Sequence, residues 1–453
     1  MWVRRKGLRW LNDLSPFQLI AIYYLVAVTI SSILIALPVG HRDGVQLNFI
    51  DILFTAVSAV SVTGLTTVPT AETFNTTGVF ILALVLQFGG IGVMTLGTLI
   101  WLVLGKKIGL KERRLIMTDQ NQTSFQGMVR LVKEIVIVVL IIELIGFLIL
   151  GTYYLQYFDP GEAYLQGFFG AISAMTNGGF DITGESLRLF KDDYFVQFIN
   201  MILIISGAIG FPVLIEVKQY IMHNSEEKTI RFSLFAKLTS FTFFALVIFG
   251  AVMISILEFN HFFSDKSWHE VFFYALFQSV TTRSGGLATV DINQFTEQTQ
   301  IFMSSLMFIG ASPSSVGGGI RTTTFALVVI FVLTFARGGN HIRIFRREIH
   351  PEDLNKAVVV TMVALFVCFS AVMALSITEP FTLNEILFEV CSAFGTVGLS
   401  LGITPGLSSF GKCVLMLLMF LGRIGLLTFL FSFKKQDKAQ GKYHFPKERI
   451  IIG

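Results

Sequence analysis

Charged residues are scarce in this chain of 453 residues. Asp, Glu, Lys and Arg make up 14% of it, hydrophobic residues make up 53%, and the mean hydropathy is +0.71. Soluble domains carry about 25% charged residues. The composition therefore excludes an ordinary soluble domain and predicts a protein that lies in a lipid bilayer.

Residues for redox, metal or nucleotide chemistry are also few. The three cysteines, Cys368, Cys391 and Cys413, lie in or beside apolar segments, so we expect buried free thiols and no disulfide framework. The seven histidines lack metal-ligand spacing, and the chain has neither a Walker loop nor a Gly-x-Gly-x-x-Gly pattern after a strand. We expect no enzyme, no organic cofactor on this chain and no nucleic-acid partner.

Long apolar runs are what the chain has in abundance. Eight of them are long enough for a helix that crosses a bilayer, which takes roughly 20 residues. They cover residues 16–37, 77–104, 129–157, 195–222, 233–257, 301–336, 357–377 and 414–433. Four shorter apolar runs lie between them, at 49–61, 164–175, 269–281 and 383–394. The pattern predicts an all-α membrane protein with eight transmembrane helices and four half-helices.

A short glycine pattern follows each of the four shorter runs. Its glycines, Gly64, Gly179, Gly286 and Gly398, lie 115, 107 and 112 residues apart. This spacing predicts four tandem helix–pore loop–helix repeats around a pseudo-fourfold central pore. The expected repeats cover residues 1–115, 116–230, 231–350 with a broken inner helix, and 351–453 with a cytoplasmic C-terminal tail.

Four such loops around one axis predict a cation filter, because a ring of backbone carbonyls can replace the hydration shell of a cation. The half-helices would point their negative C-terminal ends at this ring, and glycine leaves room for it. Close helix packing is the usual reason for a glycine in a membrane helix, but it explains four evenly spaced copies poorly. The expected filter residues are Val62, Thr63, Gly64, Asn177, Gly178, Gly179, Ser284, Gly285, Gly286, Thr396, Val397 and Gly398.

Basic residues cluster in alternate loops, and this bias predicts that both termini are cytoplasmic. The pore loops then open outward. Asp51, Glu162, Glu270 and Glu385 lie near the starts of the half-helices, where they either form an acidic vestibule that concentrates cations or stabilise the helix N-termini. Arg283, beside the third filter segment, resembles a filter-bracing residue that pairs with a vestibule carboxylate; a solvated outer charge is the alternative.

The sixth apolar run, 301–336, is too long for one straight crossing and is interrupted by glycine, serine and proline, which break helices. Irregular backbone at membrane depth must be buried in protein or line water. We expect a gate loop beneath the filter, since ten residues exceed what a helix kink needs. The loop residues are Gly310, Ala311, Ser312, Pro313, Ser314, Ser315, Val316, Gly317, Gly318 and Gly319.

Glycine-rich motifs stand at the matching place in the other units, at 89–92, 207–210 and 422–425, and are expected to keep the inner helices thin near the axis. The last motif contains Arg423. An isolated arginine at membrane depth costs about 3 kcal/mol or more unless it is paired or hydrated. We expect Arg423 to bind gate-loop carbonyls, or an acid such as Glu143, and to hold the closed state; anchoring of the loop without gating is the alternative.

The filter segments 58–66, 281–287 and 392–399 resemble those of the Trk/Ktr/HKT superfamily of potassium transporters, and the length of the chain resembles the Ktr branch with its membrane subunit KtrB. The resemblance covers essentially the whole chain, although Gly178 and Gly285 stand where alanine is common. It implies K⁺ at the filter residues, a gate loop at 310–319, a homodimer among membrane lipids and a cytosolic nucleotide-binding regulatory subunit of the KtrA type.

Glycine at all four filter positions implies a preference for potassium, since serine in the first filter accompanies sodium selectivity in relatives. Two other functions stay open on the sequence alone. One is a sodium-selective or weakly selective cation pore of the same fold, and the other is an alternating-access carrier of organic solutes. The sequence also leaves open whether Na⁺ acts as a coupling or activating ion.

Overall fold

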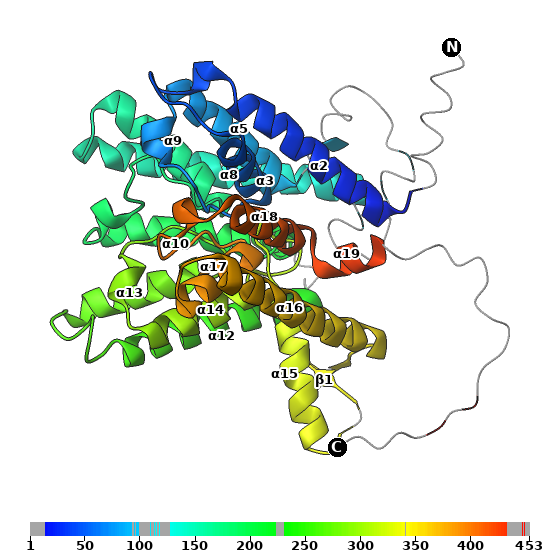
Figure 1. Cartoon of the computed structure of the whole chain (residues 1–453). Helices are drawn as coiled ribbons and strands as arrows, with labels where there is room; N and C mark the ends of the chain where they lie inside the picture. Colours follow the sequence, from blue (N-terminus) through cyan, green and yellow to red (C-terminus); the bar gives the residue numbers. More distant parts are fainter. Residues whose placement is uncertain are drawn as a thin grey trace, which may run out of the picture.

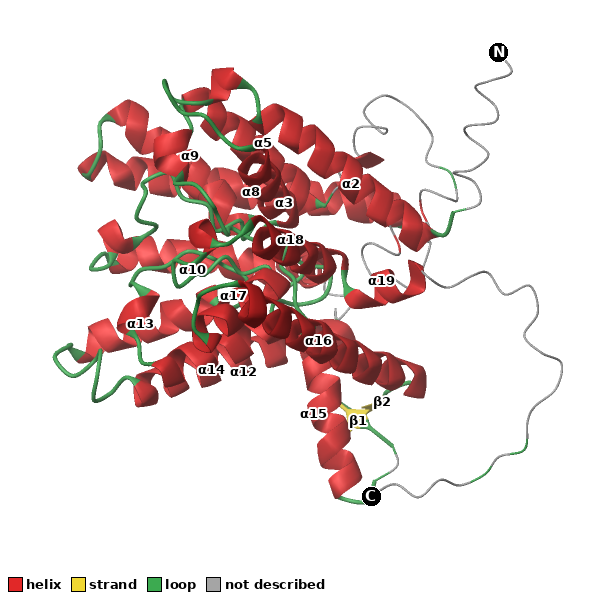
Figure 2. Ribbon diagram, in the orientation of Figure 1, coloured by secondary structure: helices red, strands yellow, loops and turns green. Residues whose placement is uncertain are grey.

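The computed structural model describes most of the chain, and nearly all of its regular structure is helical (Figure 2). The described residues are 14–92, 127–222, 231–339 and 341–432, together with 95, 97, 98, 109, 113, 115, 117, 446 and 448.

Four long apolar helices are each able to cross a membrane: α2 (Pro16–Ile35), α8 (Met128–Tyr153), α12 (Leu234–Leu257) and α16 (Pro351–Thr378). Side-chain oxygens of Ser15 and Ser233 accept N–H groups at the starts of α2 and α12. Less than half of each helix is buried, and large apolar side chains on them are exposed. These surfaces are what a helix that faces lipid requires, so the chain is a multi-pass membrane protein.

A short helix follows each long one: α3 (Phe49–Ser61), α9 (Pro160–Met175), α13 (Trp268–Thr281) and α17 (Leu383–Gly395). Their last turns are fully buried. The four half-helices predicted from the sequence are therefore present, each within a few residues of its predicted bounds.

The helix after each half-helix is interrupted. The first is α5 (Thr76–Ile91), and the predicted span beyond Gly92 lies largely outside the described residues. In the third unit α14 (Glu297–Ile309) and α15 (Thr322–Ala336) flank the irregular loop that the sequence predicted. Thr296 caps the start of α14, where its hydroxyl oxygen accepts a hydrogen bond from Thr299 N–H.

Each of the predicted spans at 195–222 and 414–433 is divided by a sharp bend, which the sequence analysis did not predict. The first divides into α10 (Tyr194–Ala208) and α11 (Phe211–Ile221), bent by 109°. The second divides into α18 (Ser409–Ile424) and α19 (Leu426–Ser432), bent by 97°. Gly210 and Gly425 stand at the two breaks with φ of 104° and 88°, which only glycine adopts cheaply. By length and composition the described helices give four membrane crossings, or six if each bent pair counts as one.

The remaining elements are short. They are α4 (Thr70–Thr73), the 3₁₀ turns η1 (Pro38–Gly40), η2 (Tyr154–Gln156), η3 (Arg188–Phe190), η4 (Ile292–Gln294) and η5 (Thr404–Gly406), and an antiparallel hairpin of β1 (Arg343–Ile344) and β2 (Arg347–Glu348). The hairpin follows α15, which extends away from the other helices (Figure 1).

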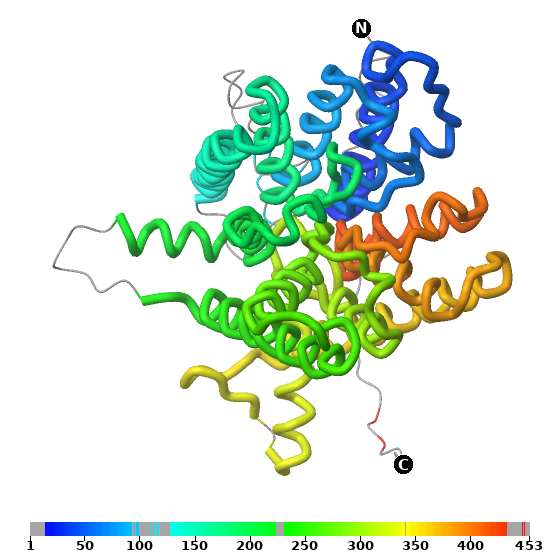
Figure 3. The backbone as a smooth tube through the Cα atoms, turned by 90° about the vertical axis from the view of Figure 1, so that its left-hand side faces the viewer, coloured from blue at the N-terminus to red at the C-terminus, as the bar shows by residue number. Residues whose placement is uncertain are grey.

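The four quarters of the sequence surround a common centre. Figure 3 shows the blue, teal, green-to-yellow and orange quarters arranged around it in chain order. Glycines let the broken helices approach the half-helices closely. A Cβ on Gly89, Gly207 or Gly422 would overlap carbonyl oxygens at the end of the half-helix in the same unit. The close approach of helix and half-helix near the centre, which these glycines predicted, is therefore present in these three units.

Candidate functional site: a ring of glycine strands above a loop

Each half-helix ends in a backbone turn that glycine normally makes. Val62, Asn177, Ser284 and Thr396 have φ of 56°, 53°, 80° and 47°, and the glycine two residues after each also has a positive φ. The left-handed conformation is disfavoured for β-branched residues such as Val62 and Thr396. Strain of this kind costs about 1–3 kcal/mol and gathers at functional sites.

The four predicted filter segments, 62–64, 177–179, 284–286 and 396–398, close a ring, and we call them the strands of this ring. A Cβ added to any of the four filter glycines would overlap the backbone of the next strand in chain order. The atoms met are Gly178 O for Gly64 at 2.5 Å, Gly286 Cα for Gly179 at 3.0 Å, Val397 O for Gly286, and Thr63 O for Gly398. The structure therefore brings all four predicted filter segments together, backbone against backbone.

Each strand is tied back to its own half-helix. The N–H groups of Thr63, Gly178, Gly285 and Val397 donate to carbonyls in the last turns, at 2.7–2.8 Å. Hydroxyl groups add a second tie in every unit. Ser58 and Ser392 Oγ accept from the Gly64 and Gly398 N–H groups at 3.1 Å, while Ser173 and Thr281 donate to the Phe180 and Leu287 carbonyls at 2.6 Å. Backbone and hydroxyl groups of each half-helix thus fix the shape of the strand that follows it.

The loop 310–319 lies directly against this ring. A Cβ on Gly317 would overlap the Ser284 side chain, and one on Gly318 would lie 2.7 Å from Thr396 Oγ1. The two glycines therefore allow the loop to touch the third and fourth strands.

Backbone hydrogen bonds also join the loop to the break between α10 and α11. Ser312 and Val316 N–H donate to the Ala208 and Gly207 carbonyls at 3.0 and 3.1 Å, and Phe211 N–H donates to Ser314 O at 2.8 Å. The bend at Gly210 thus lies where α10 and α11 form hydrogen bonds with the loop.

Two arginines hold the loop from other directions. Arg423 donates from Nη1 to Val316 O and from Nη2 to Gly89 O, so it connects the loop to the first unit. Arg321, which the sequence analysis missed, donates from Nη1 to Ser312 O (3.2 Å) and to Gly317 O. Contact of Arg423 with a loop carbonyl was predicted.

The alternative prediction, that Arg423 pairs with the acid Glu143, was wrong. Glu143 instead accepts a 2.6 Å hydrogen bond from Gln87 Nε2.

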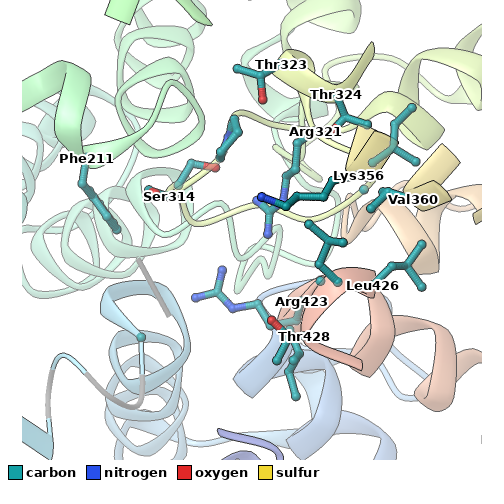
Figure 4. A pocket seen from close by; sticks show the side chains of 18 of the residues that line it. Phe211, Ser314, Arg321, Thr323, Thr324, Lys356, Val360, Arg423, Leu426 and Thr428 are labelled. Atoms are coloured by element: carbon teal, nitrogen blue, oxygen red, sulfur yellow. The ribbon is translucent and has the colours of Figure 1, made fainter. Parts of the chain in front are cut away.

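A cavity of 460 Å³ borders the loop. Figure 4 shows its lining, with Arg321, Lys356 and Arg423 extending into it from separate segments. Pro313, Ser314 and Ser315 of the loop form one wall. Gly317 and Gly318, the loop residues that touch the ring, are not among the described residues that line the cavity, so the cavity borders another part of the loop.

Both predictions for Arg283 were wrong. Its side chain is 0% exposed and donates to Leu306 O at 2.5 Å and to Gly310 O at 3.5 Å. It therefore satisfies carbonyls at the end of α14, where the negative end of a helix favours a cation. Sequence alone did not reveal this, since its acceptors lie 23 and 27 residues away.

The acidic residues of the half-helices act mainly at their N-termini. Glu270 accepts from the N–H and hydroxyl of Ser267, at 2.7 and 2.5 Å, and these bonds hold the pKa of Glu270 below its usual range. Glu385 makes the same pair of bonds to Thr382. Asp51 pairs with Lys412 at 2.9 Å, where both side chains are largely buried. Of the two explanations, N-terminal stabilisation holds for Glu270 and Glu385.

Glu389 is a second residue that sequence analysis missed. It lies on α17, is 0% exposed, and accepts hydrogen bonds from Ser400, two residues beyond Gly398, and from Thr404 at 3.1 Å. The carboxyl group thus holds the segment that leaves the fourth strand. Sequence analysis missed Glu389 because it is a carboxylate within an apolar run whose mean hydropathy stays high.

Replacing Glu389 with leucine is expected to lower the free energy of unfolding by about 1–3 kcal/mol, because Ser400 and Thr404 lose their buried acceptor. Thermal melting of the purified protein measures this loss. Glu185→Leu, at an exposed position in the segment before η3, is the control. Equal melting temperatures for the two variants would contradict the role assigned to Glu389.

The chemistry elsewhere is limited. Among the described residues no group of three or more His, Cys, Asp or Glu could hold a metal ion. Cys368 and Cys391 are buried free thiols as predicted, whereas Cys413 is exposed, because it lies on the outer side of α18.

Comparisons with known proteins agree on one family. The family model described as "Cation transport protein" (TrkH) matches residues 13–442. Two relatives from Bacillus subtilis (strain 168) match the chain over almost their full length. "Ktr system potassium uptake protein D" is 60% identical over 100% of both chains, and "Ktr system potassium uptake protein B" is 38% identical over 99% of both.

A solved structure supports the fold. The potassium transporter TrkH from Vibrio parahaemolyticus matches with a TM-score of 0.73 and 19% identity, covering 93% of this chain and 85% of that one. Since the family model matches nearly the whole chain, the protein belongs to the TrkH family of cation transport proteins.

Proposed function

We propose that this protein takes up potassium across the cell membrane as the ion-translocating subunit of a Ktr-type system. The observation that carries the proposal is the closed ring of four strands, in which the four filter glycines meet backbone atoms of their neighbours. Such a ring offers K⁺ carbonyl oxygens in place of water. The two Bacillus relatives named as potassium uptake proteins support the choice of ion.

The ion path runs through the ring, past the loop 310–319 and into the cavity beyond it. In this proposal the chain makes eight crossings as four pore-loop repeats, 1–115, 116–230, 231–350 and 351–453, with pseudo-fourfold arrangement and both termini in the cytoplasm. K⁺ binds to carbonyls of the strand residues from Val62 to Gly64 and of their counterparts. The four half-helix C-termini add negative potential at the ring.

Growth of a potassium-uptake-deficient bacterium on low potassium tests the function. Expression of this chain with its cognate regulatory subunit should restore growth, and a matched strain that carries the Gly398→Asp variant should not grow, since that side chain would enter the ring. If the wild-type chain is present in the membrane and no ⁸⁶Rb⁺ enters, the proposal is wrong.

A sodium-selective or weakly selective pore is the second candidate. Calorimetric competition between K⁺ and Na⁺ on the purified protein separates it from the first, and also tests whether Na⁺ binds as a coupling or activating ion. The alternating-access carrier is disfavoured by the ring, because each strand lies so close to the next that one added Cβ would overlap it, and so narrow a ring leaves no room for an organic solute.

The proposal includes partners. Each chain closes its own ring, so a homodimer would carry two separate pores, and mass measurement in lipid nanodiscs tests its existence. A cytosolic nucleotide-binding subunit of the KtrA type would supply control. The helices α11 and α19, which follow the bends after α10 and α18, give such a subunit elements through which to act.

Arg423→Ala is expected to raise potassium flux about two- to tenfold, because the loop loses its link to the first unit. The measurement is ⁸⁶Rb⁺ influx into liposomes with and without the regulatory subunit. Arg188→Ala, an exposed arginine on η3, is the control. Unchanged flux in Arg423→Ala would mean that the arginine anchors the loop without gating.

A further inference from the structure

We propose that the cavity beyond the gate loop is a binding site for a phosphate-bearing anion. Three cationic side chains, Arg321, Lys356 and Arg423, extend into its 460 Å³ (Figure 4). Among the described lining residues Asp353 is the single acid, and it is engaged by Lys356 at 3.1 Å. Positive charge therefore exceeds negative charge in this cavity.

Arg321 has hydrogen-bonding capacity to spare. Its Nη1 binds two loop carbonyls, Ser312 O and Gly317 O, while no described residue accepts a hydrogen bond from its Nε or Nη2. A guanidinium has five N–H groups in a planar fork that matches the oxygens of phosphate. The loop fixes one end of this fork and leaves the other for a ligand.

A helix N-terminus adds to the same site. α15 begins at Thr322, and both Thr323 and Thr324 line the cavity. N–H groups in the first turn of a helix have no acceptor within the helix, and the positive end of a 15-residue helix favours an anion. Threonine hydroxyls supply further donors. Thr323 and Thr324 thus line the same cavity as Arg321, the residue that precedes α15.

The other walls are apolar, with Leu327, Val360 and Leu426 among them. The cavity size lies in the usual range for small ligands, about 300–1,000 Å³. A phosphate group with or without an apolar portion suits such a site. The same chemistry belongs to an anionic lipid headgroup and to free phosphate, and the two sources are distinguished by experiment.

Charge reversal at Lys356 is the main test, because this lysine does not hold the loop and is partly exposed. Binding of inorganic phosphate is measured by calorimetry in neutral detergent. Binding of phosphatidylglycerol is measured against phosphatidylcholine by native mass spectrometry. Lys356→Glu should weaken binding at least about tenfold, as expected for two units of charge near an anion. Lys237→Glu, at an exposed lysine on α12 outside the cavity, should bind as the wild type does.

Arg321→Gln provides an independent variant and should weaken binding by a similar factor. Binding of phosphatidylglycerol alone would identify a lipid headgroup as the ligand, and binding of inorganic phosphate would identify a free anion; either supports the site. Equal affinities in the wild type, Lys356→Glu and Arg321→Gln would overturn it. Failure of both probes to bind the wild type would overturn it too.

Discussion

Gly64→Ser is expected to reduce the preference of uptake for potassium over sodium by at least about tenfold. A Cβ at Gly64 would lie 2.5 Å from the Gly178 carbonyl oxygen, so the first and second strands must separate. Overpacking of this kind costs about 1–3 kcal/mol, and 1.4 kcal/mol corresponds to a factor of ten. A wider ring distinguishes less well between K⁺ and Na⁺, which is the smaller and more strongly hydrated of the two ions. Competition of Na⁺ with ⁸⁶Rb⁺ influx measures the ratio.

Gly44→Ser is a matched control for this change. Gly44 has φ of 82°, close to the 89° of Gly64, but a Cβ there would meet nothing within 4 Å. The two variants therefore share the backbone strain and differ in the clash. If both retain the wild-type ratio of potassium to sodium, Gly64 does not shape a selective ring.

Removal of the loop tip is expected to raise potassium flux about tenfold or more. Ala311 N–H donates to Gly318 O at 3.1 Å, so the ends of the segment 312–317 already lie together and two glycines can replace it. The shortened loop loses its contacts with α10, α11 and both arginines. Each 1.4 kcal/mol removed from a barrier increases a rate tenfold. Liposome ⁸⁶Rb⁺ influx is the measurement.

The control for this deletion keeps the length of the loop. A variant in which Ser314 and Ser315 are replaced by glycine preserves the backbone hydrogen bonds and should keep low flux. If the deleted protein is folded, with wild-type melting behaviour, and its flux is unchanged or lower, the loop is a structural break and does not gate.

The four half-helices and the glycine strands that follow them could be predicted from sequence because their determinants are local. Each copy consists of an apolar run, a small polar segment and a glycine at nearly constant spacing, and the half-helix ends within a few residues of that pattern. The loop was predictable for the same reason, since proline and clustered glycine cannot continue a helix. The contact between the loop and the strands could be expected only from the repetition of the glycine pattern along the chain.

The missed features depend on partners far away in the chain. Hydropathy continues through Gly210 and Gly425, so the glycine motifs there predicted thin inner helices and not sharp bends, although Pro212 also follows the first bend. Arg321, Arg283 and Glu389 are charged residues inside apolar surroundings, and their roles became clear only from the carbonyls and hydroxyls that they bind. Sequence shows that such a charge needs a partner and does not show which one.

The closure of the ring has a consequence for biosynthesis. Gly398 meets Thr63, so the last strand completes a contact with the first across 335 residues. The ribosome must therefore deliver almost the whole chain before the first strand gains its final neighbour. Until then, polar backbone in the early strands has to be sheltered from lipid by the nascent protein itself or by the insertion machinery. Release of a chain truncated before the fourth half-helix should accordingly yield a protein that membrane proteases degrade rapidly.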